Sequence, residues 1–447
     1  MINLKFAEKF FIITIFFSVL FSFFFKSFNQ DAYLSNLLVL FNALLFVFLL
    51  IPVVVKNNNA RLLIVVFLCL RIFLLYLDYY GKDIANVLHS GGDSERFHQF
   101  GLIISKNLNM MNEISYTKYT DFLGILYWII GDQRFFSQFL NVVIGMWSIF
   151  IFYKILDLFK LKDSKKLFFL ALYGFYPQNI IFSSILLREA LILFFFIYSM
   201  LFFIQWLRSN SRIHIYKTII FVLLSAVFHP GMLLGLLVYG FMFLFLDIKN
   251  HRFRYSFKRK TLFILVVGLA ISLILYNTSI LTGKFAFLLL EQNTSLIDAY
   301  QSGSAVEKGG ATYLSNFQIN SVTDLIFLTP LRLIYFIFSP MPYDIRGFGD
   351  IAAIVLDSSF FYFLFYSIVR KRRIINGSVF KIFPKIFPKI FIILFLIVAL
   401  GFAIGTENSG TAMRHRTKIF PILMIVVVFI ESMNQDKLSI WNDKTND

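Results

Sequence analysis

The sequence contains a single cysteine, Cys69, among its 447 residues. An intramolecular disulfide and a cysteine-rich metal site are therefore excluded. Charged residues make up only 15% of the chain, whereas a soluble globular protein has about 25%. The motifs GxxxxGK[ST], GxGxxG, HExxH and GxSxG are absent. A nucleotide-driven pump and a zinc protease therefore lack their usual signatures.

Hydrophobic residues, in contrast, account for 58% of the chain, and 60 residues are phenylalanine. A water-soluble fold cannot bury that much apolar surface, so the composition predicts a polytopic α-helical membrane protein. The net charge of +17 comes from cations that collect in the loops on one membrane side. This pattern predicts membrane topology, and we expect no nucleic-acid partner.

A membrane-spanning helix needs about 20 apolar residues. Two shorter apolar pieces, 122–130 and 325–339, are expected to form half-spans or interfacial helices, and Lys217 and Lys418 are expected to snorkel from the ends of short spans. Twelve runs are candidate spans: 10–25, 33–55, 62–77, 135–153, 167–187, 190–207, 213–228, 231–246, 261–276, 351–369, 390–405 and 417–430.

Clusters of lysine and arginine predict the orientation, because positive loops stay in the cytoplasm. Placing the basic clusters and both termini inside makes residues 1–432 one transmembrane domain and 433–447 a cytoplasmic tail. The large outer loops are then 78–134, 277–350 and 406–418. The basic clusters lie at 154–166, 208–217, 249–260 and 370–389.

The stretch 218–246 contains no lysine, arginine, aspartate or glutamate. As one helix it would be about 44 Å long, well beyond the hydrocarbon thickness of about 30 Å. His229, Pro230 and Gly231 lie near its middle, and proline breaks a helix while glycine permits a turn. We therefore predict a tight hairpin with His229 at its apex.

Carboxylates in the first outer loop follow a Gly91-Gly92 pair at Asp93 and Glu95. A carboxylate can act as general base toward a sugar hydroxyl or hold a divalent cation. An ordinary polar loop is the competing interpretation. A metal site formed by Asp93 with His89 and His98 is a weaker one, because the spacing matches no zinc signature.

Basic and acidic residues also mark the two later outer turns. Arg188-Glu189 begins one span, and Glu407 precedes the run Arg414-His415-Arg416. Guanidinium groups bind phosphate oxygens bidentately. Salt bridges or lipid headgroup contacts are the alternatives for these arginines, and a helix-capping role is the alternative for His229.

At these residues the chain resembles a known group. Ser183-Ser-Ile-Leu-Leu-Arg188-Glu-Ala-Leu, followed by Phe228-His229-Pro-Gly, resembles the EpsG-like exopolysaccharide polymerases and the O-antigen polymerases (Wzy). Gly410-Thr-Ala-Met-Arg414-His415-Arg416 before Phe420-Pro421 looks like their terminal basic loop. Gly92-Asp93 is similar to the acidic loop of the wider polyprenyl-sugar glycosyltransferases of the C-type (GT-C) membrane fold.

The resemblance implies a glycosyltransferase that polymerises polyprenyl-diphosphate-linked oligosaccharide repeat units at the outer face of a bacterial inner membrane. Donor and acceptor are both lipid-linked, and a chain-length regulator protein and membrane lipid are further implied partners. No cofactor is implied, although the carboxylates are compatible with a divalent cation. Arg188, Arg414 and Arg416 would bind the diphosphate. Asp93, His229 or His415 would take the acceptor's proton, with Glu95, Glu189 and Glu407 as secondary candidates.

Three other functions fit parts of the same pattern. A transferase that uses a polyprenyl monophosphate sugar would share the acidic first loop. A flippase or exporter of lipid-linked glycans would need a polar path across the bilayer, to which Arg71 and Asp357 would contribute. A purely structural scaffold would leave the outer arginines and histidines without a role.

Overall fold

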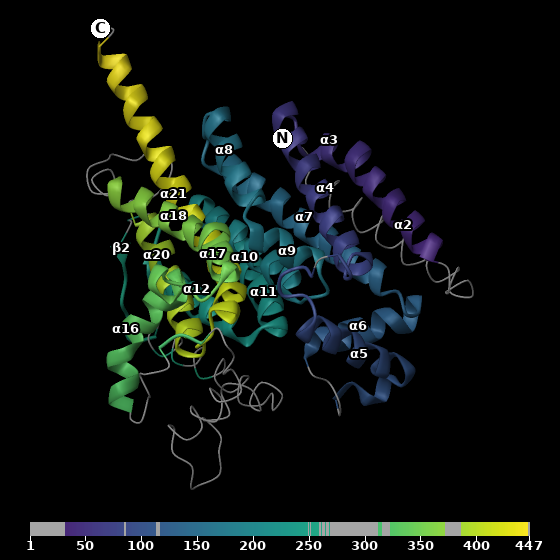
Figure 1. Cartoon of the computed structure of the whole chain (residues 1–447). Helices are drawn as coiled ribbons and strands as arrows, with labels where there is room; N and C mark the ends of the chain where they lie inside the picture. The colour runs from purple at the N-terminus through teal and green to yellow at the C-terminus, as the bar shows by residue number, and fades with distance from the viewer. Residues whose placement is uncertain are drawn as a thin grey trace. The chain divides into compact units, whose positions relative to one another are not determined.

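The computed structural model is almost entirely helical (Figure 1). It describes residues 32–84, 86–112, 117–248, 250, 252–258, 261, 264, 268, 312–314, 322–371 and 386–445. The candidate spans 10–25 and 261–276, and most of the predicted outer loop 277–350 before 322, lie outside the described residues. A strand pair of two residues each, β1 (Leu246–Asp247) and β2 (Arg252–Phe253), is antiparallel.

The chain divides into two compact units, each of which is described by itself. The first comprises residues 1–153 and 170–194, and the second comprises 154–169 and 195–447. The helices of the first half of the chain are α2 (Ala32–Leu45), α3 (Ile51–Val54), α4 (Asn58–Tyr80), α5 (Gly92–Lys106), α6 (Lys118–Ile130), α7 (Arg134–Leu158), α8 (Asp163–Gly174), α9 (Pro177–Ser184) and α10 (Glu189–Ser209). Those of the second half are α11 (Arg212–Phe228), α12 (Leu233–Phe245), α16 (Val322–Phe338), α17 (Phe348–Ala353), α18 (Ser359–Arg370), α20 (Phe387–Ile404) and α21 (Ser409–Thr445).

Seven helical segments of the described chain are long and apolar enough to cross a membrane. Many large apolar side chains on them are exposed, among them Phe48, Leu62 and Val355, which suits a lipid-facing surface. The chain is therefore a helical membrane protein, while the count of twelve spans stays a prediction. The seven segments are Ser35–Val54, Asn58–Tyr80, Arg134–Leu158, Glu189–Ser209, Phe348–Arg370, Phe387–Ile404 and Ser409–Asn434.

Several predicted boundaries differ from the structure. The expected span 167–187 is interrupted between α8 and α9, because Pro177 starts a new helix. The outer segment 406–418 is helical from Ser409 onward, since the Asn408 side chain caps α21 by accepting from the amides of Gly410 and Thr411. The 325–339 piece belongs to α16, a 17-residue helix that contains Pro330.

The predicted hairpin at His229 is confirmed. Helix α11 ends at Phe228, a single 3-10 turn covers Pro230–Met232, and α12 begins at Leu233. In the first unit, α5 and α6 lie side by side within the segment that was expected to be an outer loop (Figure 1). Gly91 and Gly92 start α5 with φ angles of 88° and 35°, a backbone region that favours glycine.

Candidate functional site

The beginning of α21 carries a dense basic sequence within a membrane-spanning segment. Arg414 is half-buried, whereas His415, Arg416 and Lys418 are buried. Lys418 was expected to snorkel to an interface, but its side chain is 0% exposed, so that expectation is wrong. Ionisable residues at membrane depth are costly and therefore usually serve a function.

His229, from the α11–α12 turn, meets His415 of α21. Their ring centroids are 5.1 Å apart at an interplanar angle of 77°. Phe402 of α20 contacts both rings, stacking on His415 at 4.6 Å and meeting His229 at 5.2 Å. A Cβ atom added at Gly231 would lie 2.9 Å from the Phe402 ring, so the turn packs tightly against α20. Two of the candidate histidines are therefore in contact within the second unit.

Lys418 lies behind His415, one helical turn further along α21. Its Nζ atom is 2.9 Å from Nδ1 of His415 and 5.3 Å from the centroid of the Phe402 ring. The sequence analysis missed a role for Lys418. The spacing of three residues from His415 was the available signal, because residues three apart on a helix are neighbours.

One ring nitrogen of each histidine lies within hydrogen-bond distance of a neighbouring group. A backbone N–H can only donate. Gly231 N–H donates to Nδ1 of His229 at 3.2 Å, so the hydrogen of a neutral His229 ring is on Nε2. Nδ1 of His415 lies 2.9 Å from Nζ of Lys418. The role of either ring in proton transfer stays a prediction.

Two ion pairs accompany the histidines in the second unit. Arg332 of α16 binds Glu407 at 2.8 Å between Nη2 and Oε1. Arg416 lies 2.8 Å from Asp357, and both side chains are 0% exposed. Arg416 also donates to the carbonyl of Ile337 at 2.8 Å.

The contacts of Arg416 are thus to protein groups, and its predicted binding of diphosphate stays a prediction. Glu407, a secondary candidate, is likewise engaged, and Arg332 was not considered as its partner from the sequence. Arg414 is more exposed than its neighbours Met413 and His415, and its predicted binding of diphosphate stays a prediction as well.

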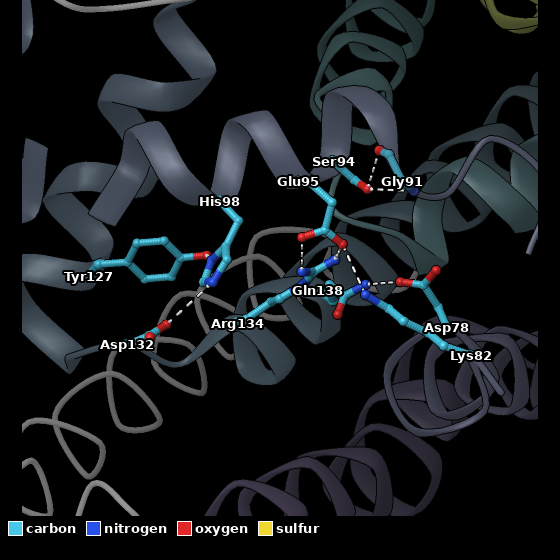
Figure 2. Close-up of polar contacts among 10 residues, drawn as sticks. All are labelled: Asp78, Lys82, Gly91, Ser94, Glu95, His98, Tyr127, Asp132, Arg134 and Gln138. Atoms are coloured by element: carbon cyan, nitrogen blue, oxygen red, sulfur yellow. Dashed lines mark hydrogen bonds and ion pairs between the residues drawn. The ribbon is translucent and has the colours of Figure 1, made fainter. Parts of the chain in front are cut away.

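In the first unit, α5 presents the acidic residues of the first outer segment. Figure 2 shows the carboxylate of Glu95 between Arg134 and Lys82. Arg134 donates two parallel hydrogen bonds of 2.6 and 2.8 Å to Glu95, and Lys82 approaches at 2.9 Å. The pKa of Glu95 falls to about 2, chiefly because Arg134 donates to its carboxylate. A carboxylate held in this way suits attachment of α5 better than proton transfer.

Asp93 lies on the first turn of the same helix and is partly exposed. Its predicted role as a base stays a prediction. No group of three His, Cys, Asp or Glu side chains in the described parts of the chain could hold a metal ion. The compatibility of the loop with a divalent cation stays a prediction as well.

His98, one turn after Glu95, joins α5 to α6. Its Nδ1 lies 3.0 Å from the hydroxyl oxygen of Tyr127, and its Nε2 lies 3.8 Å from a carboxylate oxygen of Asp132 (Figure 2). Burial lowers the pKa of His98, and the neighbouring Asp132 charge opposes that effect. The contact between α5 and α6 therefore contains a histidine whose pKa lies below its ordinary value of 6.5.

Arg188 and Glu189 follow a non-helical break between α9 and α10. The break is buried, and Asn141 of α7 donates to the carbonyls of Ile185 and Leu187, both at 2.9 Å. Glu189 is buried at the start of α10, whereas Arg188 is half-buried. Asp93, Arg188 and Glu189 belong to the first unit. That they meet the histidines at one outer surface stays a prediction.

Comparison with known proteins adds no assignment. No family model matches the chain, and no curated protein or solved structure matches it significantly. The resemblance to the polymerases thus rests on the residues quoted from the sequence, and the functional argument rests on the chemistry of the site.

Proposed function

We propose that the chain is a glycosyltransferase that polymerises polyprenyl-diphosphate-linked oligosaccharide repeat units. The reaction takes place at the outer face of a bacterial inner membrane and builds an O-antigen or a related surface polysaccharide. The observation that carries the proposal is the pairing of His229 with His415 at the basic start of α21, a membrane-spanning helix.

The charges around this pair suit an anionic ligand. The described residues there include four basic side chains and two carboxylates. A diphosphate leaving group carries about two negative charges near neutral pH, and donors aimed at developing charge are usually the largest single contribution to catalysis. The side chains counted are Arg332, Arg414, Arg416, Lys418, Asp357 and Glu407.

The proposed reaction breaks the bond between the anomeric carbon and the diphosphate oxygen of the donor. A hydroxyl oxygen of the acceptor sugar forms the new bond to that carbon, and its proton passes to a base. Polyprenyl diphosphate is released, so no nucleotide hydrolysis is required. Hydrogen bonds from imidazole Nε2–H and the Arg414 guanidinium would stabilise the charge on the leaving oxygen. The resemblance makes Asp93 the candidate base.

The alternatives gain less support. The hypothesis of a flippase or exporter places Arg71 and Asp357 on a polar path across the bilayer. Each of these side chains instead binds protein groups within its own unit. Arg71 donates to Ser183 Oγ at 2.9 Å, and Asp357 pairs with Arg416. A transferase that uses a polyprenyl monophosphate sugar would use the same cations, and the products of the reaction distinguish it.

The test is reconstitution of the purified protein with a synthetic polyprenyl-diphosphate repeat unit. A ladder of products of increasing length supports the proposal. Addition of a single sugar from a monophosphate donor, or movement of the lipid across the bilayer without chain growth, would replace it with one of the alternatives.

A matched pair of variants connects the activity to the site. His229→Gln removes the ring at one end of α11, whereas His214→Gln removes the ring near the other end, about 22 Å away along the helix. We expect the first variant to lose chain growth and the second to keep it. Equal activity of both would exclude His229 from the mechanism.

A further inference from the structure

Two tyrosines from consecutive elements of the second unit form an exposed pair, the tyrosine corner. Tyr335 lies on α16, and Tyr343 lies on the 3-10 turn Pro342–Asp344 that follows it. Their hydroxyl oxygens are 3.0 Å apart, and their rings meet at 74° with centroids 6.5 Å apart. Tyr343 is 72% exposed, whereas Tyr335 is half-buried. An exposed ring held at a fixed angle to a second ring offers a rigid surface for a flat ligand.

Tyr313 connects the tyrosine corner to the candidate site. Its ring packs on Tyr335 with centroids 5.4 Å apart. Its hydroxyl donates to the Thr406 carbonyl at 2.8 Å, and its backbone N–H donates to the Glu407 carbonyl at 2.9 Å. Arg332, which binds Glu407, precedes Tyr335 by three residues on α16, and residues with that spacing are neighbours on a helix. The tyrosine corner is therefore adjacent to the ion pair that precedes α21.

A carboxylate lies beside the two rings. The pKa of Tyr335 is raised to about 12, chiefly by its hydrogen bond with Tyr343 and further by burial and by the negative charge of Asp344. Rings and a carboxylate suit a sugar, because the C–H face of a pyranose ring stacks on an aromatic ring while its hydroxyl groups donate to a carboxylate. An anionic headgroup fits less well, since Asp344 would repel it.

The tyrosine corner also precedes a membrane-spanning segment. The candidate span Phe348–Arg370 begins five residues after Tyr343. A glycan attached to a lipid carrier leaves the bilayer at such a boundary. Tyrosine is also common there as a plain interfacial anchor, which is the competing role for Tyr343.

We propose that Tyr335, Tyr343 and Asp344 form a binding subsite for an oligosaccharide, in which a sugar ring stacks on Tyr343 and donates hydroxyl hydrogens to Asp344. This inference rests on the proposed function and refines it, because the subsite binds the glycan portion of the lipid-linked substrate. The subsite takes no part in bond formation. Its loss should therefore raise KM for the lipid-linked repeat unit and leave kcat nearly unchanged.

Binding is measured on the full chain in zwitterionic nanodiscs. The probe is the oligosaccharide repeat unit from the cells that make the protein, released from its polyprenyl diphosphate by mild acid. We expect Tyr343→Ala to weaken binding about fivefold, because stacking on one aromatic ring is lost. Asp344→Ala should weaken it to a similar extent through loss of the hydroxyl contacts. Tyr343→Phe should keep most of the affinity, since the ring face remains.

Two further variants separate a sugar platform from a membrane anchor. Tyr343→Leu keeps an apolar side chain at the boundary but offers no flat ring, so it should lose as much affinity as Tyr343→Ala. Tyr216→Ala removes a tyrosine of α11 that is 61% exposed, and this matched control should bind normally. Full affinity of Tyr343→Leu would assign Tyr343 to apolar contact alone and overturn the inference.

Chain growth distinguishes failure of the inference from failure of the proposed function. Polymerisation by the unaltered protein, with the same KM in Tyr343→Ala as in Tyr216→Ala, overturns the subsite and leaves the polymerase. The absence of saccharide binding by the unaltered protein overturns the subsite as well. Saccharide binding that depends on Tyr343 and Asp344 as expected, without extension of lipid-linked repeats, would remove the polymerase while the subsite stands.

Discussion

Arg134 binds Glu95 through two parallel hydrogen bonds, so the first residue of α7 holds the first turn of α5. Nη1 lies 2.6 Å from Oε2 and Nη2 lies 2.8 Å from Oε1. Bidentate geometry of this kind is the strongest form of an arginine–carboxylate contact. Because Asp93 lies on the same turn of α5 as Glu95, the contact also determines where the candidate base stands.

This contact predicts a specific dependence on pH. The pKa of Glu95 is lowered in the folded protein to about 2, so its contribution to stability is complete above its ordinary value of 4.5 and is lost as the pH falls from there toward 2. A spin label at Gln99→Cys, in a Cys69→Ser background that also carries His98→Gln, should therefore report an immobile α5 at pH 5. Glu95→Gln should mobilise the label already at pH 7.5, and an unchanged spectrum in that variant would contradict the role of the contact.

His98 predicts a change at higher pH. Its folded pKa is lowered by burial, so its contribution is present above the ordinary value of 6.5 and is lost as the pH falls through the folded value. Glu95, Lys82, Asp132 and Arg134 are the charged groups that act on it. The mobility of the label on α5 should rise as the pH falls below about 6.5. His98→Gln should abolish this step, and persistence of the step in that variant would assign it to another group.

The buried pair of Arg416 and Asp357 allows its structural and catalytic roles to be separated. Asp357→Asn leaves the Arg416 charge without its partner and should destabilise the protein by about 3–5 kcal/mol, measured as loss of folded protein on heating in detergent. The double variant Arg416→Met with Asp357→Leu removes both charges and should recover most of that loss. If the double variant also keeps full chain growth, Arg416 is not a diphosphate ligand.

The tight approach of Gly231 to Phe402 predicts a steric effect at the turn between α11 and α12. Gly231→Ala places a Cβ atom 2.9 Å from the ring, so Phe402 must shift, which should cost about 1–3 kcal/mol. Since Phe402 stacks on His415, the shift should also reduce chain growth. Gly349→Ala, where nothing lies within 4 Å of the new atom, is the control and should be neutral. Equal stability of the two variants would show that the ring moves freely.

Arginine geometry gives the last prediction. Arg414→Lys should lower the rate of chain growth about a hundredfold if the guanidinium binds phosphate bidentately, because lysine offers only a point charge. Arg188→Lys should act in the same direction. Arg212→Lys, at an exposed start of α11, is the control for the loss of a guanidinium. Full activity of Arg414→Lys would reduce its role to contact with lipid.

The sequence predicted those features that depend on local chemistry. The hairpin at His229 follows from Pro230 and Gly231 within an apolar run, and the helical membrane class follows from composition. Other features could not be predicted from the sequence, because they depend on partners that are distant along the chain. Lys418 resembled a span-flanking lysine until the position of Phe402 was known, and the Glu95 contact requires Arg134, which is remote in the sequence. Neither partner leaves a pattern near the residue that it binds.

The break between α9 and α10 has a consequence for the stiffness of this region. The side-chain amide of Asn141 donates to two carbonyls of the break, those of Ile185 and Leu187, and the Leu187 amide donates to the first of them as well. A discontinuity that is supported from within the protein needs no ligand to keep its form. The stretch before Arg188 is therefore a rigid support for the start of α10.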